Sequence, residues 1–399
     1  MNEWLEGQPG FREIERDGRG RELPSYRRAH RPPQHGHHVH LTVDMHLQEI
    51  LEQVLERAMR DYAAEKVMAA LIDPVTGDVL ALGARPAWIR GAPLGIRRNM
   101  AVADVYEPGS TFKMVTLAAA FEEGLCGPET VFFCHNGYFS DATLPAPLRD
   151  AGSYGDLTSV EIFAKSSNIG TYQMARRLGP VRLHRHAQAF GFGRPSGIPL
   201  TAEASGRLRP PGQWSGTSLS RVMMGYEVSV TVLQMALATS VIANEGVLMQ
   251  PRLIERIVDQ DGALVEEFPS TEARRVLRAQ TALQVRDAMV AVTADGGTGT
   301  RARIEGVEVA GKTGTARKFD PATGQYASGR YVASFIGFAP AHAPQLVAAV
   351  VLDDPRADDQ RSGGLAAAPV FADLMQRCLS HLRSTGAGAN WSDPNSSNE

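Results

Sequence analysis

The spacing of apolar positions changes along the chain, and each change predicts a different kind of structure. Between residues 44 and 66 apolar side chains recur at helical spacing, which predicts an amphipathic helix. Two short apolar runs follow at 67–73 and 79–83, and the glycine-containing turn between them predicts a β-hairpin. From about residue 110 to residue 300 the pattern is mainly helical.

The last quarter of the chain returns to strand-like patterns. Three apolar runs separated by turns predict strands, and an amphipathic helix follows them; the runs span 307–319, 331–340 and 345–353, and the helix spans 366–382. Strands therefore lie at both ends of the sequence, with helices between them. The sequence predicts an α/β mixed fold, in which the chain leaves one sheet to build a helical subdomain and then returns to the sheet.

Composition and charge exclude several classes of protein. Of the 399 residues 43% are apolar and 21% are charged, as in ordinary globular proteins, and the formal net charge is −3. No basic stripe accompanies this charge, so nucleic acid is not an expected partner. No run approaches the roughly 18 apolar residues of a membrane span, and the N-terminal residues show no signal-peptide pattern.

The cysteines and histidines do not indicate a metal site. Cys126, Cys134 and Cys378 are odd in number, and we expect isolated buried thiols; a Cys126–Cys134 bridge is the alternative in an exported protein. Five histidines between residues 30 and 40 lack the accompanying cysteine or carboxylate spacing of a zinc site. We therefore predict no metal.

The first chemical motif is Ser110-x-x-Lys113, which begins a predicted helix after a Pro-Gly pair. Residues three apart share a helix face, so the two side chains are expected within contact distance. A serine hydroxyl is a weak nucleophile until a base accepts its proton, and lysine is that base only if burial or a nearby cation keeps it neutral. Alone the motif is weak, because a chain of this length contains about one such match by chance.

The second motif is Lys165-Ser166-Ser167-Asn168, inside a predicted helical stretch. Ser166 can relay a proton between Lys113 and a leaving group, and Asn168 can hydrogen-bond a substrate amide. The alternative is a helix start that is capped by serine. On its own, this motif favours the structural alternative.

The third motif is Lys312-Thr313-Gly314-Thr315, in a predicted strand. The lysine and the two hydroxyls can hold a carboxylate, and the strand's N–H groups can pair with an extended peptide. The sequence suggests that Gly314 lets a substrate backbone lie close to the strand. A turn at a strand end is the alternative.

The three motifs persuade in combination, because they follow one another in the order that penicillin-fold enzymes use. They are separated by 56 and 146 residues. Around them the chain resembles a class B penicillin-binding protein, a monofunctional D,D-transpeptidase of bacterial division or elongation. The resemblance covers about residues 39–382 and includes the segments HLTVDMHLQEILEQVL, LIDPVTGDVLALGARP, RNMAVADVYEPGSTFKMVT and GGTGTRARIEGVEVAGKTGTARK.

The resemblance implies a role for each motif residue. It makes Ser110 the acylated nucleophile and Lys113 its general base, with Ser166 and Asn168 in the proton relay and the substrate-holding wall. It assigns contact with the substrate's terminal carboxylate to Lys312, Thr313 and Thr315, with Gly314 also in the substrate-binding strand. The backbone N–H groups of Ser110 and Thr315 would form the oxyanion hole. No metal or organic cofactor is implied.

The resemblance also implies a fold and a setting. The fold is that of penicillin-binding proteins and serine β-lactamases: a mainly antiparallel central sheet flanked by helices, with a helical subdomain. We expect a remnant of an N-terminal pedestal or linker at 1–38, the transpeptidase domain at 39–382 and a flexible tail at 383–399. The expected location is the extracytoplasmic face of the cytoplasmic membrane, although the sequence itself carries no anchor. Expected partners are peptidoglycan stem peptides, β-lactams, a membrane glycosyltransferase and division or elongation proteins.

Two alternatives stay open at this point. A D,D-carboxypeptidase or a serine β-lactamase shares the fold but resolves the acyl-enzyme with water. Glu227 is the candidate carboxylate for activating that water, although we expect it to be structural. A sensor or a scaffold of wall synthesis belongs to another class of protein. The intact set of motif residues argues against a scaffold that has lost catalysis.

Overall fold

The computed structural model describes residues 2–23, 30–87, 98–141, 144, 146–320, 323–357 and 360–386, and the chain separates into two compact units. The smaller unit comprises Met1–Thr42 and Arg252–Ser270. The larger unit comprises Val43–Pro251 and Thr271–Glu399 and contains all three motifs. Most of the predicted tail, residues 387–399, lies outside the described residues.

The smaller unit joins two segments that lie far apart in the sequence. Strand β13 (Ile254–Val258) pairs on one side with β14 (Leu264–Glu267) and on the other with β3 (His38–Leu41), and both pairings are antiparallel. The unit also contains helix α1 (Asn2–Leu5) and the paired strands β1 (Phe11–Arg12) and β2 (His30–Arg31). Segment 1–38 thus shares its unit with a hairpin that the sequence analysis did not single out.

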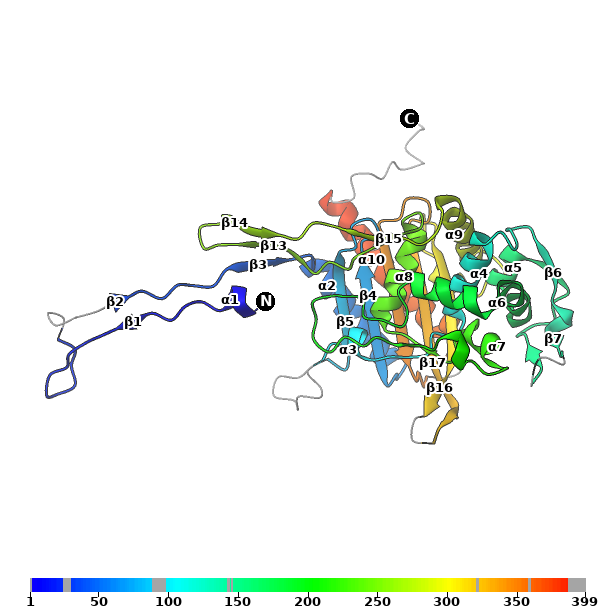
Figure 1. Ribbon diagram of the computed structural model, residues 1–399, viewed down its shortest axis with the longest axis horizontal. Helices are drawn as coiled ribbons and strands as arrows, with labels where there is room; N and C mark the ends of the chain where they lie inside the picture. The colour runs from blue at the N-terminus through cyan, green and yellow to red at the C-terminus, as the bar shows by residue number, and fades with distance from the viewer. Residues whose placement is uncertain are drawn as a thin grey trace, which may run out of the picture. The chain divides into compact units, whose positions relative to one another are not determined.

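A five-stranded antiparallel sheet forms the centre of the larger unit (Figure 1). Its strands, in spatial order, are β16 (Ala310–Asp320), β17 (Gln325–Ala339), β18 (Leu346–Asp353), β4 (Lys66–Ile72) and β5 (Val79–Arg85). The predicted hairpin and the three predicted C-terminal strands are therefore confirmed. Strand β18 is almost entirely buried because helices cover both faces of the sheet.

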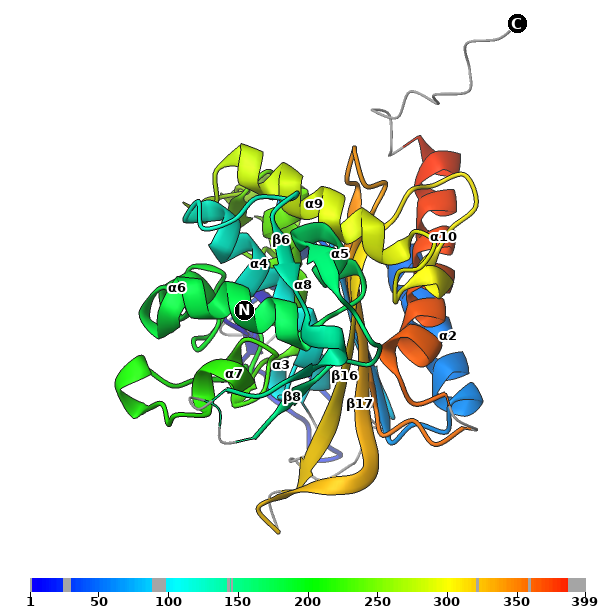
Figure 2. The ribbon, with the colours of Figure 1, turned by 90° about the vertical axis from the view of Figure 1, so that its right-hand side faces the viewer.

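Helices α2 (Met45–Asp61) and α10 (Ala368–Thr385) cover one face of this sheet (Figure 2). Each places one apolar stripe in the core, and the rings of Phe335 and Phe371 lie 4.7 Å apart there. Asp44 caps α2 by accepting hydrogen bonds from the next turn. The helix predicted for 44–66 ends earlier, at Asp61, because the chain must turn before it enters β4. Helix α10 runs three residues beyond its predicted end.

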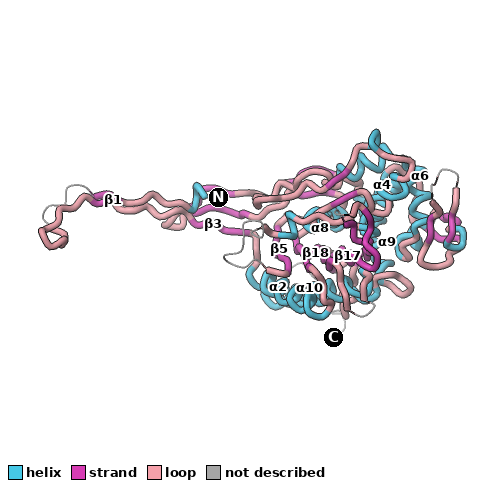
Figure 3. The backbone as a smooth tube through the Cα atoms, turned by 90° about the horizontal axis from the view of Figure 1, so that it is seen from below, coloured by secondary structure: helices cyan, strands magenta, loops and turns pink. Residues whose placement is uncertain are grey.

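The opposite face of the sheet carries the helical subdomain (Figure 3). Helix α8 (Val232–Ala243) is buried at every position and lies against β4, β17 and β18. Helix α9 (Ala279–Thr293) packs against α8, helices α4 (Lys113–Glu122) and α5 (Ser159–Ala164) pack against α9 and each other, and α6 (Asn168–Ala189) packs against α4 and α5. The expected architecture of a mixed antiparallel sheet with an inserted helical part is confirmed.

Short elements complete the larger unit. Two short α-helices are α3 (Met100–Ala103) and α7 (Ser218–Val222). Short strands form four two-stranded sheets: β6 (Val131–Phe133) with β9 (Asp156–Thr158), β7 (Tyr138–Phe139) with β8 (Leu148–Arg149), β10 (Arg207–Leu208) with β11 (Val228–Ser229), and β12 (Val247–Met249) with β15 (Glu272–Arg275). All three cysteines are free thiols; Cys134 and Cys378 are buried, as expected, whereas Cys126 is only partly buried. Among the described residues no helix is long and apolar enough to cross a membrane, and no cluster of three potential metal ligands occurs.

Candidate active site

The Ser110 turn is a short 3₁₀ helix, Gly109–Phe112, that leads directly into α4. Gly109 has a φ of +55°, and its N–H donates to the carbonyl of Gly225 at 3.2 Å. A Cβ on Gly225 would lie 2.3 Å from the Gly109 carbonyl oxygen, so the close approach requires glycine there. Ser110 stays partly exposed, whereas Thr111 and Phe112 beside it are buried. The turn therefore presents the hydroxyl on a rigid support.

Lys113 occupies the interior directly behind this turn, with only 1% of its surface exposed. Its Nζ lies 2.6 Å from the Ser166 carbonyl oxygen, 2.7 Å from Asn168 Oδ1 and 3.3 Å from Ser166 Oγ. Burial lowers the pKa of Lys113 to about 7, and the nearby Asp150 carboxylate opposes this shift. A neutral amine that donates to the two carbonyl oxygens keeps its lone pair free for a hydroxyl proton.

Ser166 does not lie inside a helix, contrary to the prediction for the second motif. It lies in the break between α5 and α6, where its φ is +58°, and Ser167 caps α6 by accepting from the Gly170 N–H. The structural alternative is therefore confirmed, since Ser167 caps a helix. The break also turns the carbonyl and hydroxyl of Ser166 towards Lys113, and the proton relay through Ser166 stays a prediction. Asn168 is the first residue of α6.

The side-chain amide of Asn168 bridges two parts of the protein. Its Oδ1 accepts from Lys113, and its Nδ2 donates to the Arg149 carbonyl at 2.7 Å. The amide thus positions Lys113. Its expected contact with a substrate amide stays a prediction.

Asp150 holds the start of α6 and was not recognised in the sequence. Its carboxylate accepts from Ser167 Oγ at 2.6 Å and from the backbone N–H groups of Asn168 at 2.5 Å and Ile169 at 3.1 Å. A negative charge is favourable there because the N-terminus of a helix carries partial positive charge. The aspartate lies in an irregular segment, and no local pattern connects it to a helix that starts 18 residues later.

Strand β16 carries the third motif at the edge of the sheet. Lys312 is fully buried, its Nζ lies 3.2 Å from the Thr313 carbonyl and 5.4 Å from the Phe163 ring centroid. Burial and the proximity of Lys113 hold the pKa of Lys312 well below its usual value. Thr315 is exposed, which suits a residue that meets substrate. Because β16 has a neighbour in the sheet on one side alone, its other edge can pair with an extended peptide.

Gly314 is required for a reason other than the one expected from the sequence. A Cβ at this position would lie 2.9 Å from the carbonyl oxygen of Pro108 and 2.3 Å from Ser334 Oγ on the neighbouring strand. The glycine therefore lets the Ser110 turn pack directly on β16. Substrate approach to the same glycine stays a prediction.

We expect the substitution Gly314→Ala to push the Ser110 turn away from β16. The Pro108 oxygen belongs to the backbone and cannot rotate away, so the variant should lose about 1–3 kcal/mol of stability. The rate of penicillin labelling should also fall by at least about tenfold, since the nucleophile is misplaced. Thermal melting and labelling kinetics measure the two effects. Gly216→Ala is the control, since its new Cβ meets no atom within 4 Å; equal behaviour of the two variants would contradict the packing argument.

The Asp150 carboxylate provides a second prediction. Because its charge raises the pKa of Lys113, Asp150→Asn should lower that pKa and move the rise of acylation rate to lower pH. Loss of the charged cap should also cost about 1–2 kcal/mol of stability. A pH profile of penicillin acylation measures the first effect. Asp156→Asn, an exposed carboxylate on β9, should leave the profile in place; a profile that moves to higher pH in Asp150→Asn would refute the assignment.

Glu227, the possible water-activating base, is already engaged. Its Oε2 accepts from the Arg209 guanidinium and, at 2.7 Å, from Ser218 Oγ, and its N–H donates to Glu107 at 2.8 Å. Tyr326 donates to the same Glu107 carboxylate at 3.1 Å. Glu227 thus belongs to a network that fastens the segment ahead of Ser110, and this supports the structural role expected for it.

The fold and the arrangement of the three motifs agree with one class of protein domain, the transpeptidase domain of penicillin-binding proteins. A family model described as "Penicillin binding protein transpeptidase domain" matches residues 67–376. The chain belongs to this family, among the class B penicillin-binding proteins.

Individual relatives agree with this assignment. The chain is 35% identical over 389 residues to penicillin-binding protein PbpB of Mycolicibacterium smegmatis and 33% identical over 384 residues to stage V sporulation protein D of Bacillus subtilis. These alignments cover 94% and 95% of the chain, which spans about 59% of the length of either relative. Among solved structures, penicillin-binding protein 3 of Mycobacterium tuberculosis complexed with ampicillin superimposes with a TM-score of 0.82 at 32% identity, over 92% of this chain and 82% of that one.

Proposed function

We propose that this chain is a peptidoglycan D,D-transpeptidase that works through an acyl-enzyme on Ser110. The observation that carries the proposal is the buried Lys113, whose pKa near 7 makes it a base at neutral pH directly behind the serine turn. All three of its donor contacts are with residues of the second motif. The base is therefore oriented by residues that the proposed reaction itself requires.

In the first half-reaction Ser110 Oγ attacks the carbonyl of a terminal D-Ala-D-Ala peptide. Lys113 accepts the hydroxyl proton, and Ser166 passes a proton to the nitrogen of the leaving D-Ala. The N–H groups of Ser110 and Thr315 bind the oxygen that becomes negative in the tetrahedral intermediate. Meanwhile the substrate pairs with the edge of β16, and its terminal carboxylate meets Lys312, Thr313 and Thr315, with Gly314 between them.

In the second half-reaction an amine from a neighbouring stem peptide attacks the ester carbonyl. A C–N bond forms, the bond between the carbonyl carbon and Ser110 Oγ breaks, and the amine's proton returns through the lysine to the serine. A β-lactam enters the first half-reaction and acylates the same serine. The ampicillin and aztreonam complexes of the related mycobacterial protein support this extension to the present chain.

The lifetime of the penicillin adduct tests transfer to an amine against hydrolysis. We expect a burst equal to one penicillin per chain, followed by release over many minutes, because Glu227 is already bound by Arg209 and Ser218. Mass spectrometry of the adduct over time measures the release. Rapid turnover would instead establish a β-lactamase or carboxypeptidase, and a missing burst would reject acyl-serine chemistry altogether.

The setting of the reaction is part of the same proposal. Because its proposed substrates are peptidoglycan stem peptides, the proposed location is the extracytoplasmic face of the cytoplasmic membrane. The proposed partners are a membrane glycosyltransferase and division or elongation proteins. The domain division proposed from the sequence has the pedestal remnant at 1–38, catalysis at 39–382 and the tail at 383–399. A sensor or scaffold role has less support, because the sequence contains all three motifs and Lys113 contacts Ser166 and Asn168 of the second one.

A further inference from the structure

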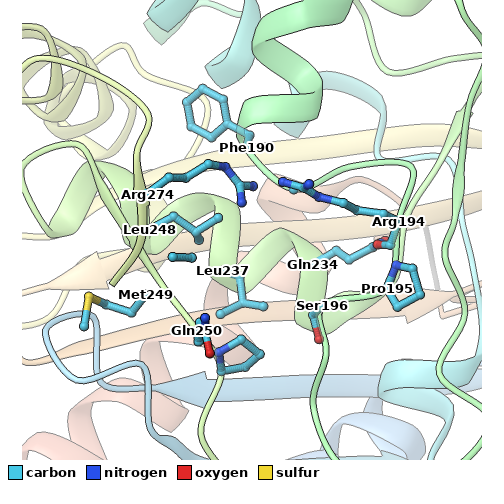
Figure 4. Close-up of a pocket in the computed structure, with 13 residues that line it drawn as sticks. Phe190, Arg194, Pro195, Ser196, Gln234, Leu237, Leu248, Met249, Gln250 and Arg274 are labelled. Atoms are coloured by element: carbon cyan, nitrogen blue, oxygen red, sulfur yellow. The ribbon is translucent and has the colours of Figure 1, made fainter. Parts of the chain in front are cut away.

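Two arginines face each other on the surface of the helical subdomain. Both lie far from Ser110 in the sequence. Arg194 follows α6 in a loop, and Arg274 comes from β15. Figure 4 shows their guanidinium groups pointing towards one another across a hollow beneath Phe190. The same two side chains also line a second, adjoining hollow of about 330 Å³. The pair thus lies where two depressions of the surface meet.

Neither guanidinium has a carboxylate partner in the described part of the chain. Arg274 donates from Nε to the Ala189 carbonyl at 2.7 Å, and Arg194 donates from Nη2 to the Gln188 carbonyl at 3.5 Å. Both carbonyls belong to the last turn of α6, where the helix carries partial negative charge. The described lining of both hollows contains no acidic residue, and the nearby Glu203 is occupied by Ser196 and Gly197.

The like charges are costly to hold together. Partial burial, and then the charge of Arg194, lower the pKa of Arg274. The two backbone carbonyls satisfy one N–H of each side chain, so several N–H groups of both forks stay available. Paired guanidinium groups with free N–H donors match the oxygens of a carboxylate or a phosphate.

One side of the hollow that the two arginines line is apolar, and this side is called the recess. The whole hollow, including the side of the arginines, has a volume of about 60 Å³, so it admits only a short aliphatic group. Apolar side chains from three segments form the recess: Pro195, Leu237, Leu248, Met249 and Pro251. The polar residues Ser196, Gln234 and Gln250 line the same hollow. A ligand that suits both parts has a charged oxygen group next to a short aliphatic group.

We propose that Arg194 and Arg274 form a second binding site of this protein, for an oxyanion carried on a small apolar group. The anion bridges the two guanidinium groups, and the aliphatic group enters the recess. The oxyanion is a carboxylate of a peptide or a phosphate group, and the apolar recess favours the carboxylate. This site is independent of acyl transfer, so its test and that of Ser110 fail or succeed separately.

Calorimetric titration of the full chain tests the site with isobutyrate, its neutral analogue isobutyramide, and inorganic phosphate. We expect saturable binding of isobutyrate and none of isobutyramide, because the charge and the aliphatic group are both used. Tighter binding of isobutyrate than of phosphate supports a carboxylate on an aliphatic group. Equal or tighter binding of phosphate would show that the recess contributes nothing and would overturn the apolar part of the proposal. Absence of saturable binding by both anions overturns the proposal.

Three variants assign any binding to the pair. Arg194→Ala alters an exposed side chain, so it should weaken the binding of isobutyrate at least about tenfold without affecting folding. Arg274→Lys keeps the charge but loses the fork, and it should weaken binding similarly. Arg60→Ala, an exposed arginine on α2, is the control and should bind as the wild type does. Undiminished binding in Arg194→Ala and Arg274→Lys would place the anion elsewhere and reject the site.

Discussion

Ser110→Ala should abolish covalent labelling by fluorescent penicillin, with a fall in acylation rate of at least about 10³-fold. In the proposed reaction the hydroxyl oxygen of Ser110 forms the ester bond with the penicillin carbonyl. Alanine has no hydroxyl, so the ester cannot form. Ser110 is partly exposed at the end of a buried turn, so the alanine variant should fold normally. Labelling followed by gel fluorescence measures the effect, and thermal melting confirms the fold.

Ser384→Ala provides the matched control for this experiment. Ser384 is an exposed serine in the last turn of α10, outside all three motifs. It should label at the wild-type rate. Equal labelling of Ser110→Ala, or no labelling of the wild-type chain, would contradict the proposed nucleophile.

Lys113→Met should lower the acylation rate by about 10²–10⁴-fold, the usual contribution of a general base. Methionine fills a similar volume but has no lone pair to accept the serine proton. The Ser166 carbonyl and Asn168 Oδ1 also lose their donor, so some loss of stability should accompany the loss of rate. Lys318→Met is the control on the motif-bearing strand β16, where the lysine forms ion pairs with Glu65 and Asp353. It should label nearly as the wild type does.

The pH profile of the wild-type chain tests the same base without a substitution. The acting form of Lys113 is the neutral amine, and its pKa is lowered to about 7 by burial. The amine is mostly protonated at pH 6 and mostly neutral at pH 8, so the acylation rate should rise roughly tenfold between them. Stopped-flow kinetics with penicillin measures this rise. A rate that is flat from pH 6 to 8 would refute a base with this pKa.

Local patterns made much of the fold predictable. Helices α2 and α10 each carry one apolar stripe, which predicts an amphipathic helix. Two apolar runs around a glycine turn predict the hairpin of β4 and β5. Apolar runs separated by turns likewise predict the three C-terminal strands β16, β17 and β18. The pairing of β13 with β3 was not predictable, because the partners lie about 200 residues apart and are short and half exposed.

By itself, the sequence determined the three motifs and their order, and it predicted Ser110 as the nucleophile and Lys113 as its base, because these features depend on residue types at fixed short spacings. Only the tertiary structure decided how the site works. Packing around Lys113 sets its pKa, Asp150 reaches α6 from a distant loop, and Gly314 is required by the Pro108 carbonyl rather than by substrate alone. These are contacts between segments far apart in the chain, and burial and charge act through space, so no local spacing encodes them.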